Sequence, residues 1–442
     1  MKTFNSDTIT AIATPTGRGG VGIVRISGPD AKDIATKIAQ KHLEPRFAQF
    51  TSFYDSENSV IDEGIVLFFE NPHSFTGEDV VELQSHGSPI VLDQLIKCAI
   101  HHGARMAKPG EFSERAFLNK KIDLTQAEAI ADLIAASSEQ AARLAVRSLQ
   151  GEFSKKIQVL QKSLTHLRMQ IEAMIDFPEE EIDFLSSPRV NIVLQKIIDD
   201  VLKVKKQAKQ GALLQSGLQI VIAGKPNTGK SSLLNYLSGR ESAIVTAIPG
   251  TTRDILRESI QIDGIPLHII DTAGLRETDD IVEQEGVRRA YEQMKQADLI
   301  LLLVDVSDSD SDGDGDDASD KMLVIRNKID LINEKPSIKD NIISLSIKNN
   351  IGMDLLIDAL KKAAGFQARD NDGFIARRRH VDAIDRAYQF LLHGQNQLTQ
   401  HRAGELLAED LRHAQQALSE ITGEFSSDDL LGEIFSSFCI GK

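Results

Sequence analysis

The sequence is poor in cysteine, in aromatic residues and in long apolar runs. Its 442 residues include two cysteines, Cys98 and Cys439, no tryptophan and 5% aromatic residues. Two cysteines cannot form a disulfide framework or a four-cysteine zinc site, and they are typical of a reducing compartment. The longest apolar run, 299–304, is too short to span a bilayer, and the N-terminal residues lack the apolar core of a signal peptide. We therefore expect a cytoplasmic protein that neither spans a membrane nor is secreted.

An excess of basic residues is also missing. Lys and Arg total 50 against 65 Asp and Glu, which gives a formal net charge of −15. This balance argues against indiscriminate coating of nucleic acid but is compatible with a local basic groove. A composition with 41% hydrophobic and 26% charged residues is that of a folded chain. At about 150 residues per domain, the length predicts roughly three domains.

Four stretches follow one another along the chain. Residues 1–118 hold short β-type runs, 119–212 show a helical period, 213–372 alternate strand and helix, and 373–442 are helical again. Helical segments on both sides of the α/β stretch predict that it is a domain inserted into one helical domain. The expected fold is multidomain: an N-terminal α+β domain, a helical domain and an inserted P-loop, Ras-like α/β domain with a mainly parallel sheet. The strands expected in the inserted domain are 218–224, 259–263, 266–271, 299–306, 322–328 and 341–346.

The run GKPNTGKS at 224–231 matches the phosphate-loop pattern G-x-x-x-x-G-K-S. It directly follows an apolar strand and precedes the helical SSLLNYLSG, which is the context that the motif requires. The glycines let backbone N–H groups turn inward around phosphates, and the helix N-terminus adds its positive end. We expect Lys230 to reach the β- and γ-phosphates and the Ser231 hydroxyl to bind Mg²⁺.

Three further motifs follow in the order found in GTPases. DTAG at 271–274 ends a strand, where Asp271 can hold magnesium through water and the Gly274 amide can contact the γ-phosphate. NKID at 327–330 ends another strand, and its Asp330 can accept both the ring N–H and the amino group of guanine, a pair that adenine lacks. The run 346–348 lies where GTPases place a loop that supports the base. Together these elements predict specificity for GTP.

The catalytic details differ from those of Ras. Leu275 follows the DTAG motif, so the Gln that orients water in Ras is missing, and no Arg finger is evident. Asn227 could bind a monovalent cation with backbone carbonyls of 246–252, or it could simply shape the turn. Glu283 is the nearest candidate for orienting water, the alternative being an exposed carboxylate at a helix start.

The expected GTP-binding residues are Asn227, Thr228, Gly229, Lys230, Ser231, Ser232, Thr246, Ala247, Ile248, Pro249, Gly250, Thr251, Thr252, Asp271, Thr272, Ala273, Gly274, Asn327, Lys328, Asp330, Ser346, Ile347 and Lys348.

The combined motifs resemble one family. GKPNTGKSSLLN, IPGTTRD, DTAGLRET and NKID, with TPTGRGGVGIVRISG near the start and FCIGK at the end, are similar to the bacterial tRNA-modification GTPases of the MnmE (TrmE) family. The resemblance extends over essentially the whole chain. It implies a tetrahydrofolate-binding and dimerising domain at 1–118, a helical domain at 119–212 and 373–442, and a GTPase domain at 213–372.

The resemblance also implies an activity and partners. Members are potassium-dependent GTP hydrolases that work as homodimers with an FAD-containing, MnmG-type protein, in a heterotetramer or larger complex. Together they add an aminomethyl-type (carboxymethylaminomethyl) group to C5 of the wobble uridine of certain tRNAs, using a tetrahydrofolate one-carbon unit.

Carried over by motif, the family's site residues fall on defined positions. The potassium positions are Asn227, Thr246, Ile248 and Thr251, and the magnesium positions are Ser231 and Thr252. Glu283 matches the residue that orients the attacking water. The expected catalytic residues are therefore Glu283, Lys230 and Asn227. The folate positions are Arg25, Glu82, Lys121 and Lys442, each of which could also be part of a surface ion pair, and Arg276 matches the Arg after DTAG-Leu. Ile347 departs from the family, which usually has Ala there.

Two patterns are misleading. Residues 17–22 match G-x-G-x-x-G, but a β-type run follows instead of a helix, which argues against FAD or NAD binding by this chain. Cys439 mimics a prenylation site, but Lys442 is a poor last residue, so we reject lipidation. Two interpretations of Cys439 remain, a reactive or folate-proximal thiol and a small apolar residue at a helix end.

Two questions stay open. The acidic run 305–320 predicts a solvated loop or weak cation binding, since it lacks the Glu that closes an EF-hand. The alternative function is a regulatory GTP-binding switch in ribosome or RNA assembly, without one-carbon chemistry. The only hint of a basic RNA-binding segment is 377–380, which is as readily a solvated helix start. The folate-type residues and the FCIGK end favour the tRNA-modifying enzyme.

Overall fold

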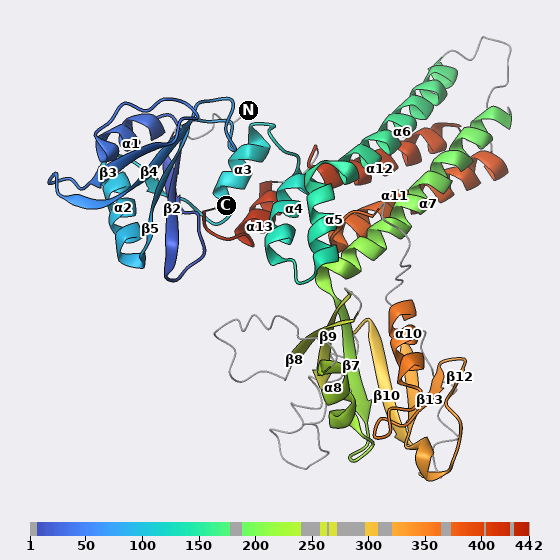
Figure 1. Ribbon diagram of the computed structural model, residues 1–442. Helices are drawn as coiled ribbons and strands as arrows, with labels where there is room; N and C mark the ends of the chain where they lie inside the picture. Colours follow the sequence, from blue (N-terminus) through green and yellow to red (C-terminus); the bar gives the residue numbers. More distant parts are fainter. Residues whose placement is uncertain are drawn as a thin grey trace, which may run out of the picture. The chain divides into compact units, whose positions relative to one another are not determined.

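The computed structural model describes residues 7–176, 188–239, 257–262, 265–271, 297–307, 321–363, 373–401, 404–424 and 428–441 (Figure 1). The chain divides into two compact units, residues 1–131 with 418–442 and residues 132–417. The first unit therefore joins the two ends of the chain. In the described part, no helix is long and apolar enough to cross a membrane.

A six-stranded sheet forms the centre of the first unit. Its strand order is β3-β4-β5-β2-β1-β6, antiparallel except for the parallel pair β1–β6. Helices α1 and α2 share one hydrophobic core with residues of the central strands such as Val24, Ile26 and Leu83. The elements are β1 Ile9–Ile12, β2 Gly19–Ser27, α1 Ala31–Ala39, β3 Gln49–Tyr54, β4 Val60–Phe69, β5 Val80–Gly87, α2 Pro89–His101 and β6 Arg105–Met106.

The opposite face of this sheet carries charged residues. Successive side chains of a strand point to opposite faces, so Arg25 lies on the face away from its neighbours Val24 and Ile26. Arg25 is paired in register with Glu82 on β5 and with Ala11 on β1. Phe112 of α3 (Glu111–Leu118) packs on this side, in a small core with Ile9 and Ala11.

Helices from both ends of the chain pack together beside α3. Leu124 and Ala127, in the first part of α4 (Leu124–Ala135), form one core with Ile434 and Phe435 of α13 (Asp428–Ser436) and with Phe438. The resulting contacts bring the FCIGK end of the chain into the first unit. Because β2 begins at Gly19 and continues to Ser27, no helix follows the G-x-G-x-x-G match.

Long helices form one part of the second unit. α6 (Glu152–Asp176), α7 (Pro188–Ser216) and α11 (Arg378–Asn396) lie along one another in an elongated bundle (Figure 1). Their facing sides are apolar at helical spacing, with Leu164, Leu194 and Leu391 fully buried. The remaining helical elements are α5 Glu139–Leu149, the π-helical turn Gln397–His401 and α12 Gly404–Thr422.

The junction of these helices holds a buried ion pair. Asp132, which is 5% exposed, accepts hydrogen bonds from Nη2 of Arg377 at 2.8 Å and from Nε2 of Gln215 at 3.1 Å. His380 is 2% exposed, and its Nδ1 accepts the N–H of Arg377 at 3.0 Å. The interpretation of 377–380 as an RNA-binding segment stays a prediction. The interpretation as a solvated helix start holds for Arg378, which is exposed at the first residue of α11, but is wrong for His380, which is buried, and for Arg377, which is half-buried. The physical reason is the carboxylate of Asp132, which lies 245 positions earlier in the sequence.

The other part of the second unit is an α/β domain with a seven-stranded sheet. Its strand order is β12-β13-β11-β10-β7-β9-β8, parallel except at the two edge pairs β8–β9 and β12–β13. A single core joins the sheet to α8 and α10. The elements are β7 Leu218–Gly224, α8 Lys230–Ser238, β8 Arg257–Ile262, β9 Ile265–Asp271, β10 Leu299–Asp305, β11 Met322–Asn327, β12 Ser337–Lys339, β13 Ile342–Ser344 and α10 Met353–Ala363.

The six strands expected from the sequence all occur, with ends that differ by at most two residues. The mainly parallel sheet is confirmed. β12 was not predicted, because a three-residue edge strand is too short to show a period. α7 precedes the sheet and α11 follows it, as expected for an inserted domain; the boundaries at residues 213 and 372 stay a prediction.

Candidate functional site

The sequence motifs meet at the carboxyl edge of the seven-stranded sheet. β7, β9, β10 and β11 are parallel, and residues at or near their carboxyl ends are paired: Gly224 with Leu303, Ile222 with Asp271, and Asp305 with Asn327. Since parallel strands end at the same edge, the phosphate loop after β7 and the NKID motif at the end of β11 lie at the same edge of the sheet, with β10 between the two strands. In open α/β sheets this edge is where ligands bind.

The phosphate loop needs glycine at two positions. Gly224 has φ 144° and Gly229 has φ 106°, both in the range that side chains disfavour. A Cβ at Gly224 would lie 2.4 Å from the carbonyl oxygen of Leu303, and one at Gly229 would lie 2.4 Å from Nδ2 of Asn327. Because Gly229 is the N-cap of α8, the N–H groups of the first turn of this helix border the loop.

Lys230 reaches back across the loop. Its Nζ donates hydrogen bonds to the carbonyl oxygens of Gly224 at 2.7 Å and Lys225 at 2.8 Å. The hydroxyl of Thr228 also donates to the carbonyl oxygen of Lys225, at 2.8 Å. The ammonium group therefore lies at the loop itself, where a phosphate enclosed by the loop would meet it.

One side chain connects the phosphate loop with the base-supporting loop. Asn327 is 4% exposed; its Nδ2 donates to the carbonyl oxygen of Thr228 at 2.8 Å, and its Oδ1 accepts the N–H of Ile347 at 3.1 Å. The hydroxyl of Ser346 donates to Oδ1 of Asp330. Ile347 is buried and keeps its backbone contact, so replacing Ala by Ile leaves this connection intact.

A second candidate site lies on the charged face of the six-stranded sheet. Nε and Nη2 of Arg25 donate to Oε1 of Glu82 at 3.1 and 2.8 Å, and the two side chains are 22% and 15% exposed. The guanidinium also lies 5.8 Å from the ring centroid of Phe75 and 5.7 Å from that of Phe112. Both bonds end on the same oxygen of Glu82, so among the described residues its Oε2 has no donor. A carboxylate oxygen and two aromatic rings thus border one half-buried arginine.

The end of the chain lies against this second site. Nη1 of Arg25 contacts the carbonyl oxygen of Gly441 at 3.5 Å. Gly441 has φ 94°, and a Cβ there would lie 2.1 Å from the carbonyl oxygen of Ile12, so only glycine fits. Cys439 is exposed, and its carbonyl oxygen accepts the N–H of Gly110 at 3.3 Å. Nζ of Lys121 donates to the carbonyl oxygen of Pro72 at 2.8 Å.

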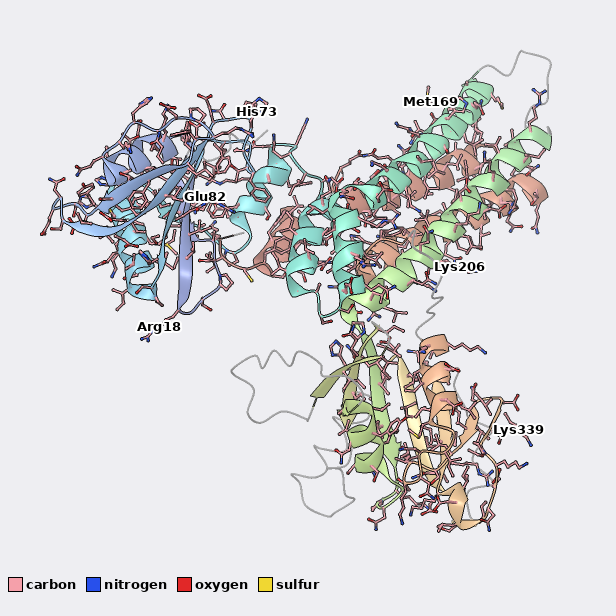
Figure 2. The ribbon with its side chains drawn as sticks, viewed as in Figure 1. Arg18, His73, Glu82, Met169, Lys206 and Lys339 are labelled. Carbon is pink, nitrogen blue, oxygen red and sulfur yellow. The ribbon has the colours of Figure 1, made fainter. Side chains whose placement is uncertain are left out.

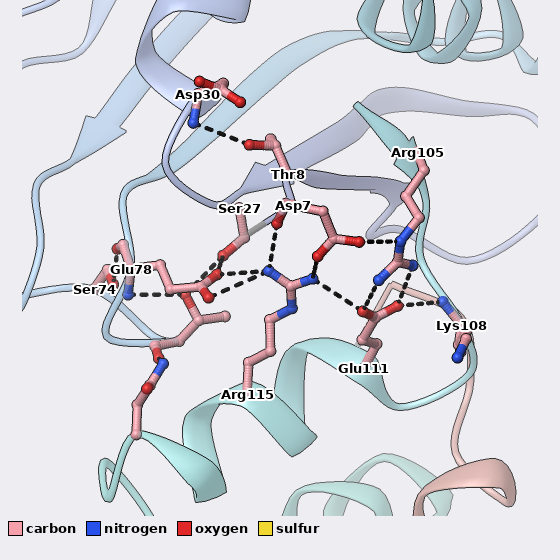
Figure 3. Close-up of polar contacts among 12 residues, drawn as sticks. Asp7, Thr8, Ser27, Asp30, Ser74, Glu78, Arg105, Lys108, Glu111 and Arg115 are labelled. Atoms are coloured by element: carbon pink, nitrogen blue, oxygen red, sulfur yellow. Dashed lines mark hydrogen bonds and ion pairs between the residues drawn. The ribbon is translucent and has the colours of Figure 1, made fainter. Parts of the chain in front are cut away.

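An ionic network fixes α3 beside the second site (Figure 3). Arg115, whose side chain is 9% exposed, donates to Glu111 at 3.0 Å, to Asp7 at 2.9 Å and to Glu78 at 3.1 Å. Arg105 binds Asp7 and Glu111 from the other side. Burial alone would raise the pKa of Asp7 and of Glu111, but hydrogen bonds from the two arginines hold both pKa values below their usual range. The network therefore stays ionised and holds Phe112 in place next to Arg25.

Comparison with known proteins decides the family. The family model described as "MnmE helical domain" matches residues 124–439, and the one described as "GTP-binding protein TrmE N-terminus" matches residues 8–121. The tRNA modification GTPase MnmE of Legionella pneumophila is 58% identical over 99% of both chains, and that of Coxiella burnetii is 59% identical over 99% of both. The chain belongs to the MnmE family of tRNA modification GTPases.

Solved structures include more distant matches. A variant of Aquifex aeolicus Era bound to GDP.AlF4- is 23% identical, with a TM-score of 0.26 over 39% of this chain and 66% of that chain. A TM-score this low carries no conclusion about this chain. The MnmE family of P-loop GTP hydrolases is shown by the relatives that match along the whole length.

Several residues expected in the site of an MnmE protein lie outside the described residues. These are 246–252, 272–274, Arg276, Glu283 and Lys442; for Asp271 only the backbone is described. Ser231 and Ser232 are in the first turn of α8, and Asn227, with φ 65°, is exposed in the loop. The hydroxyl and amide oxygens of Ser231 and Asn227 are of the type that Mg²⁺ and K⁺ prefer, so these residues fit the expected cations.

Sequence reasoning missed one residue at the edge of the sheet. Asp305 was expected both in the strand 299–306 and at the start of the solvated acidic run 305–320. It is the last residue of β10, as the strand prediction had it, and its carboxylate pairs with Nζ of Lys328. Its side chain is 14% exposed, so for Asp305 the loop prediction is wrong. Residues 308–320 lie outside the described residues. The available signal was position, because Asp305 directly follows the strongest apolar run of the chain.

Proposed function

We propose that this MnmE-family chain hydrolyses GTP in a potassium-dependent reaction that serves the modification of tRNA. With an FAD-containing, MnmG-type partner it adds a carboxymethylaminomethyl-type group to C5 of the wobble uridine, using a tetrahydrofolate one-carbon unit. The main support for GTP binding is the side chain of Asn327, which is hydrogen-bonded both to the phosphate loop and to the base-supporting loop. A single nucleotide can therefore contact both loops.

Each residue of the nucleotide site has a role in this proposal. Lys230 binds the β- and γ-phosphates, Asp330 accepts the two guanine N–H groups, and Glu283 orients the attacking water. Ser231 and Thr252 hold Mg²⁺, whereas Asn227, Thr246, Ile248 and Thr251 hold K⁺. When bound, these cations offset the negative charge that develops on the phosphates. Arg276 follows the DTAG-Leu motif in the sequence.

Replacement of Asn227 tests the potassium dependence. Asn227→Ala removes the only side-chain amide of the loop, so GTP hydrolysis should lose its stimulation by K⁺ while nucleotide affinity stays nearly unchanged. The measurement is single-turnover hydrolysis in K⁺ and in Na⁺ at equal ionic strength, with GDP affinity determined separately. Asn349→Ala, at an exposed position of the same domain, is the matched control. Equal turnover of the wild type in Na⁺ and K⁺ would remove the potassium part of the proposal.

The charged face of the first unit supports the folate part of the proposal. Oε2 of Glu82 is a suitable acceptor for the N–H groups of a pterin, and the rings of Phe75 and Phe112 border the same place. Arg25, Lys121 and Lys442 supply cations for the carboxylates of a glutamate tail.

Cys439 lies three residues before the end of the chain, on the segment that contacts β1, and its side chain is exposed. This position is compatible with a reactive or folate-proximal thiol and with a small apolar residue at a helix end.

Calorimetry with tetrahydrofolate separates the two candidate functions. The full chain should bind tetrahydrofolate, and Glu82→Gln should weaken binding by about tenfold, because a charged acceptor contributes about 1.5–3 kcal/mol. Arg18→Ala is the control, since Arg18 is exposed on the loop before β2, away from Glu82 (Figure 2). Absence of binding by the wild type would favour the alternative, a regulatory GTP switch without one-carbon chemistry.

The proposal includes an assembly. The chain acts as a homodimer in the cytoplasm, in which two GTPase domains meet, and the dimer joins the FAD-containing partner in a heterotetramer or larger complex that receives tRNA. The identity to MnmE proteins along the whole chain supports this part of the proposal.

A further inference from the structure

We propose that Asp305 is a positioning residue for guanine recognition, because it fixes the side chain of Lys328 in the NKID motif. This inference rests on the proposed function, in which residues 327–330 form the guanine pocket. Neither the sequence motifs nor the family resemblance gives Asp305 a role. Its position at the end of β10, next to β11, suggests one.

The two side chains meet across neighbouring strands. Asp305 is in register with Asn327, the residue directly before Lys328, and its Oδ2 forms an ion pair with Nζ of Lys328. Lys328 has φ 71°, a left-handed conformation that is uncommon for a residue with a side chain. The backbone turn at Lys328 thus separates Asn327, which binds the phosphate loop, from Asp330, which binds Ser346.

The carboxylate of Asp305 is itself held in place. Its Oδ1 accepts the N–H of Ser307 at 3.1 Å and the hydroxyl of Ser307 at 2.7 Å. The N–H of Val306 donates to the carbonyl oxygen of Asn327 at 3.1 Å, which anchors the same turn to β11. Both carboxylate oxygens are therefore engaged, one by the turn and one by Lys328.

The charge state agrees with this arrangement. Burial alone would raise the pKa of Asp305, but the hydrogen bonds from Lys328 and Ser307 lower it to about 2. The carboxylate is consequently ionised at every pH at which the protein is assayed.

Fixing Lys328 has a consequence for nucleotide binding. A lysine side chain is long and flexible, and a pocket that contains a free lysine must order it when a ligand binds. The ion pair with Asp305 removes most of that freedom beforehand, so the stem of Lys328 forms a fixed wall of the pocket. Loss of the ion pair should therefore weaken guanine nucleotide binding only because the side chain of Lys328 is no longer fixed.

A double-mutant cycle on GDP affinity tests this inference. Asp305→Asn, Lys328→Met and the double variant are compared by calorimetry of the full chain with GDP. Asp305→Asn should weaken GDP binding about tenfold, and the double variant should equal Lys328→Met within about twofold, because Asp305 acts only through Lys328. Glu334→Gln is the matched control, since it removes the carboxylate that pairs with Arg326 of the same strand β11, at 3.7 Å.

The possible outcomes are distinguishable. The inference would be overturned if Asp305→Asn bound GDP as tightly as the wild type, or if the losses of GDP affinity in the two single variants added up in the double variant. Either result would leave the proposed guanine pocket unaffected. A wild type that binds ADP as well as GDP would overturn the proposed function itself. If thermal unfolding shows that Asp305→Asn does not fold, Asp305→Ser replaces it. This variant removes the carboxylate that pairs with Lys328, and an affinity equal to the wild type would again contradict the inference.

Discussion

Asp330→Asn is expected to change the preferred nucleotide from GTP to XTP. The carboxylate of Asp330 accepts two N–H groups of guanine in the proposed pocket, whereas an amide offers a donor where guanine also has one. Xanthine has a carbonyl oxygen in place of the amino group and would accept that donor. Sites built to hydrogen-bond a substrate reject a mismatched analogue by about 10⁴-fold, so the ratio of GTP to XTP affinities should shift by about that factor.

Competition between GTP and XTP measures this shift. The asparagine keeps an acceptor for the hydroxyl of Ser346, which binds Oδ1 of Asp330 in the structure, so folding should be preserved. Asp340→Asn is the matched control, because Asp340 is exposed between β12 and β13 with φ 50°, a conformation that asparagine tolerates. An unchanged preference for GTP in Asp330→Asn would remove Asp330 from the base pocket.

Glu283→Ala should lower the rate of hydrolysis without weakening nucleotide binding. A residue that only orients water contributes to the transition state and little to the ground state. Such roles contribute about 10²–10⁴-fold, so kcat should fall within that range. Glu283→Gln should keep more activity if orientation dominates, and little if Glu283 abstracts the proton.

Single-turnover hydrolysis at saturating K⁺, with affinity measured separately, decides the role of Glu283. Glu334→Ala, at a half-buried position of the same domain, is the control. The alternative, an exposed carboxylate at a helix start, predicts a small loss of stability and nearly normal turnover. A Glu283→Ala rate within about threefold of the wild type would lie below the range for such roles and refute the catalytic assignment.

The parts of the fold that follow from local chemistry were predictable from the sequence. The phosphate loop needs glycine at 224 and 229, and these two glycines stand out in the sequence because they lie between a strand and a helix. The apolar runs at 218–224 and 299–304 are long enough to mark central strands of a parallel sheet. Asn327 ends the neighbouring strand β11 and Asp330 comes three residues later, which placed both at the carboxyl edge.

Contacts between distant residues could not be predicted in this way. Arg115 pairs with Asp7 across 108 positions, and Arg377 pairs with Asp132 across 245. Helical spacing reveals which face of a helix is polar, but not whether a distant carboxylate covers that face. Asp305 was hidden for the same reason: its role depends on the register between β10 and β11, and the acidic residues that follow it favoured a loop.

The carboxyl edge of the seven-stranded sheet is the place where, in this proposal, GTP is bound and hydrolysed. Single-turnover release of phosphate by the full chain, with GTP and with ATP at equal concentrations in Mg²⁺ and K⁺, tests this central claim most directly. Because Asp330 recognises a pair of donors that adenine lacks, we expect phosphate release from GTP and almost none from ATP. Equal rates with the two nucleotides, or no release from either, would contradict it.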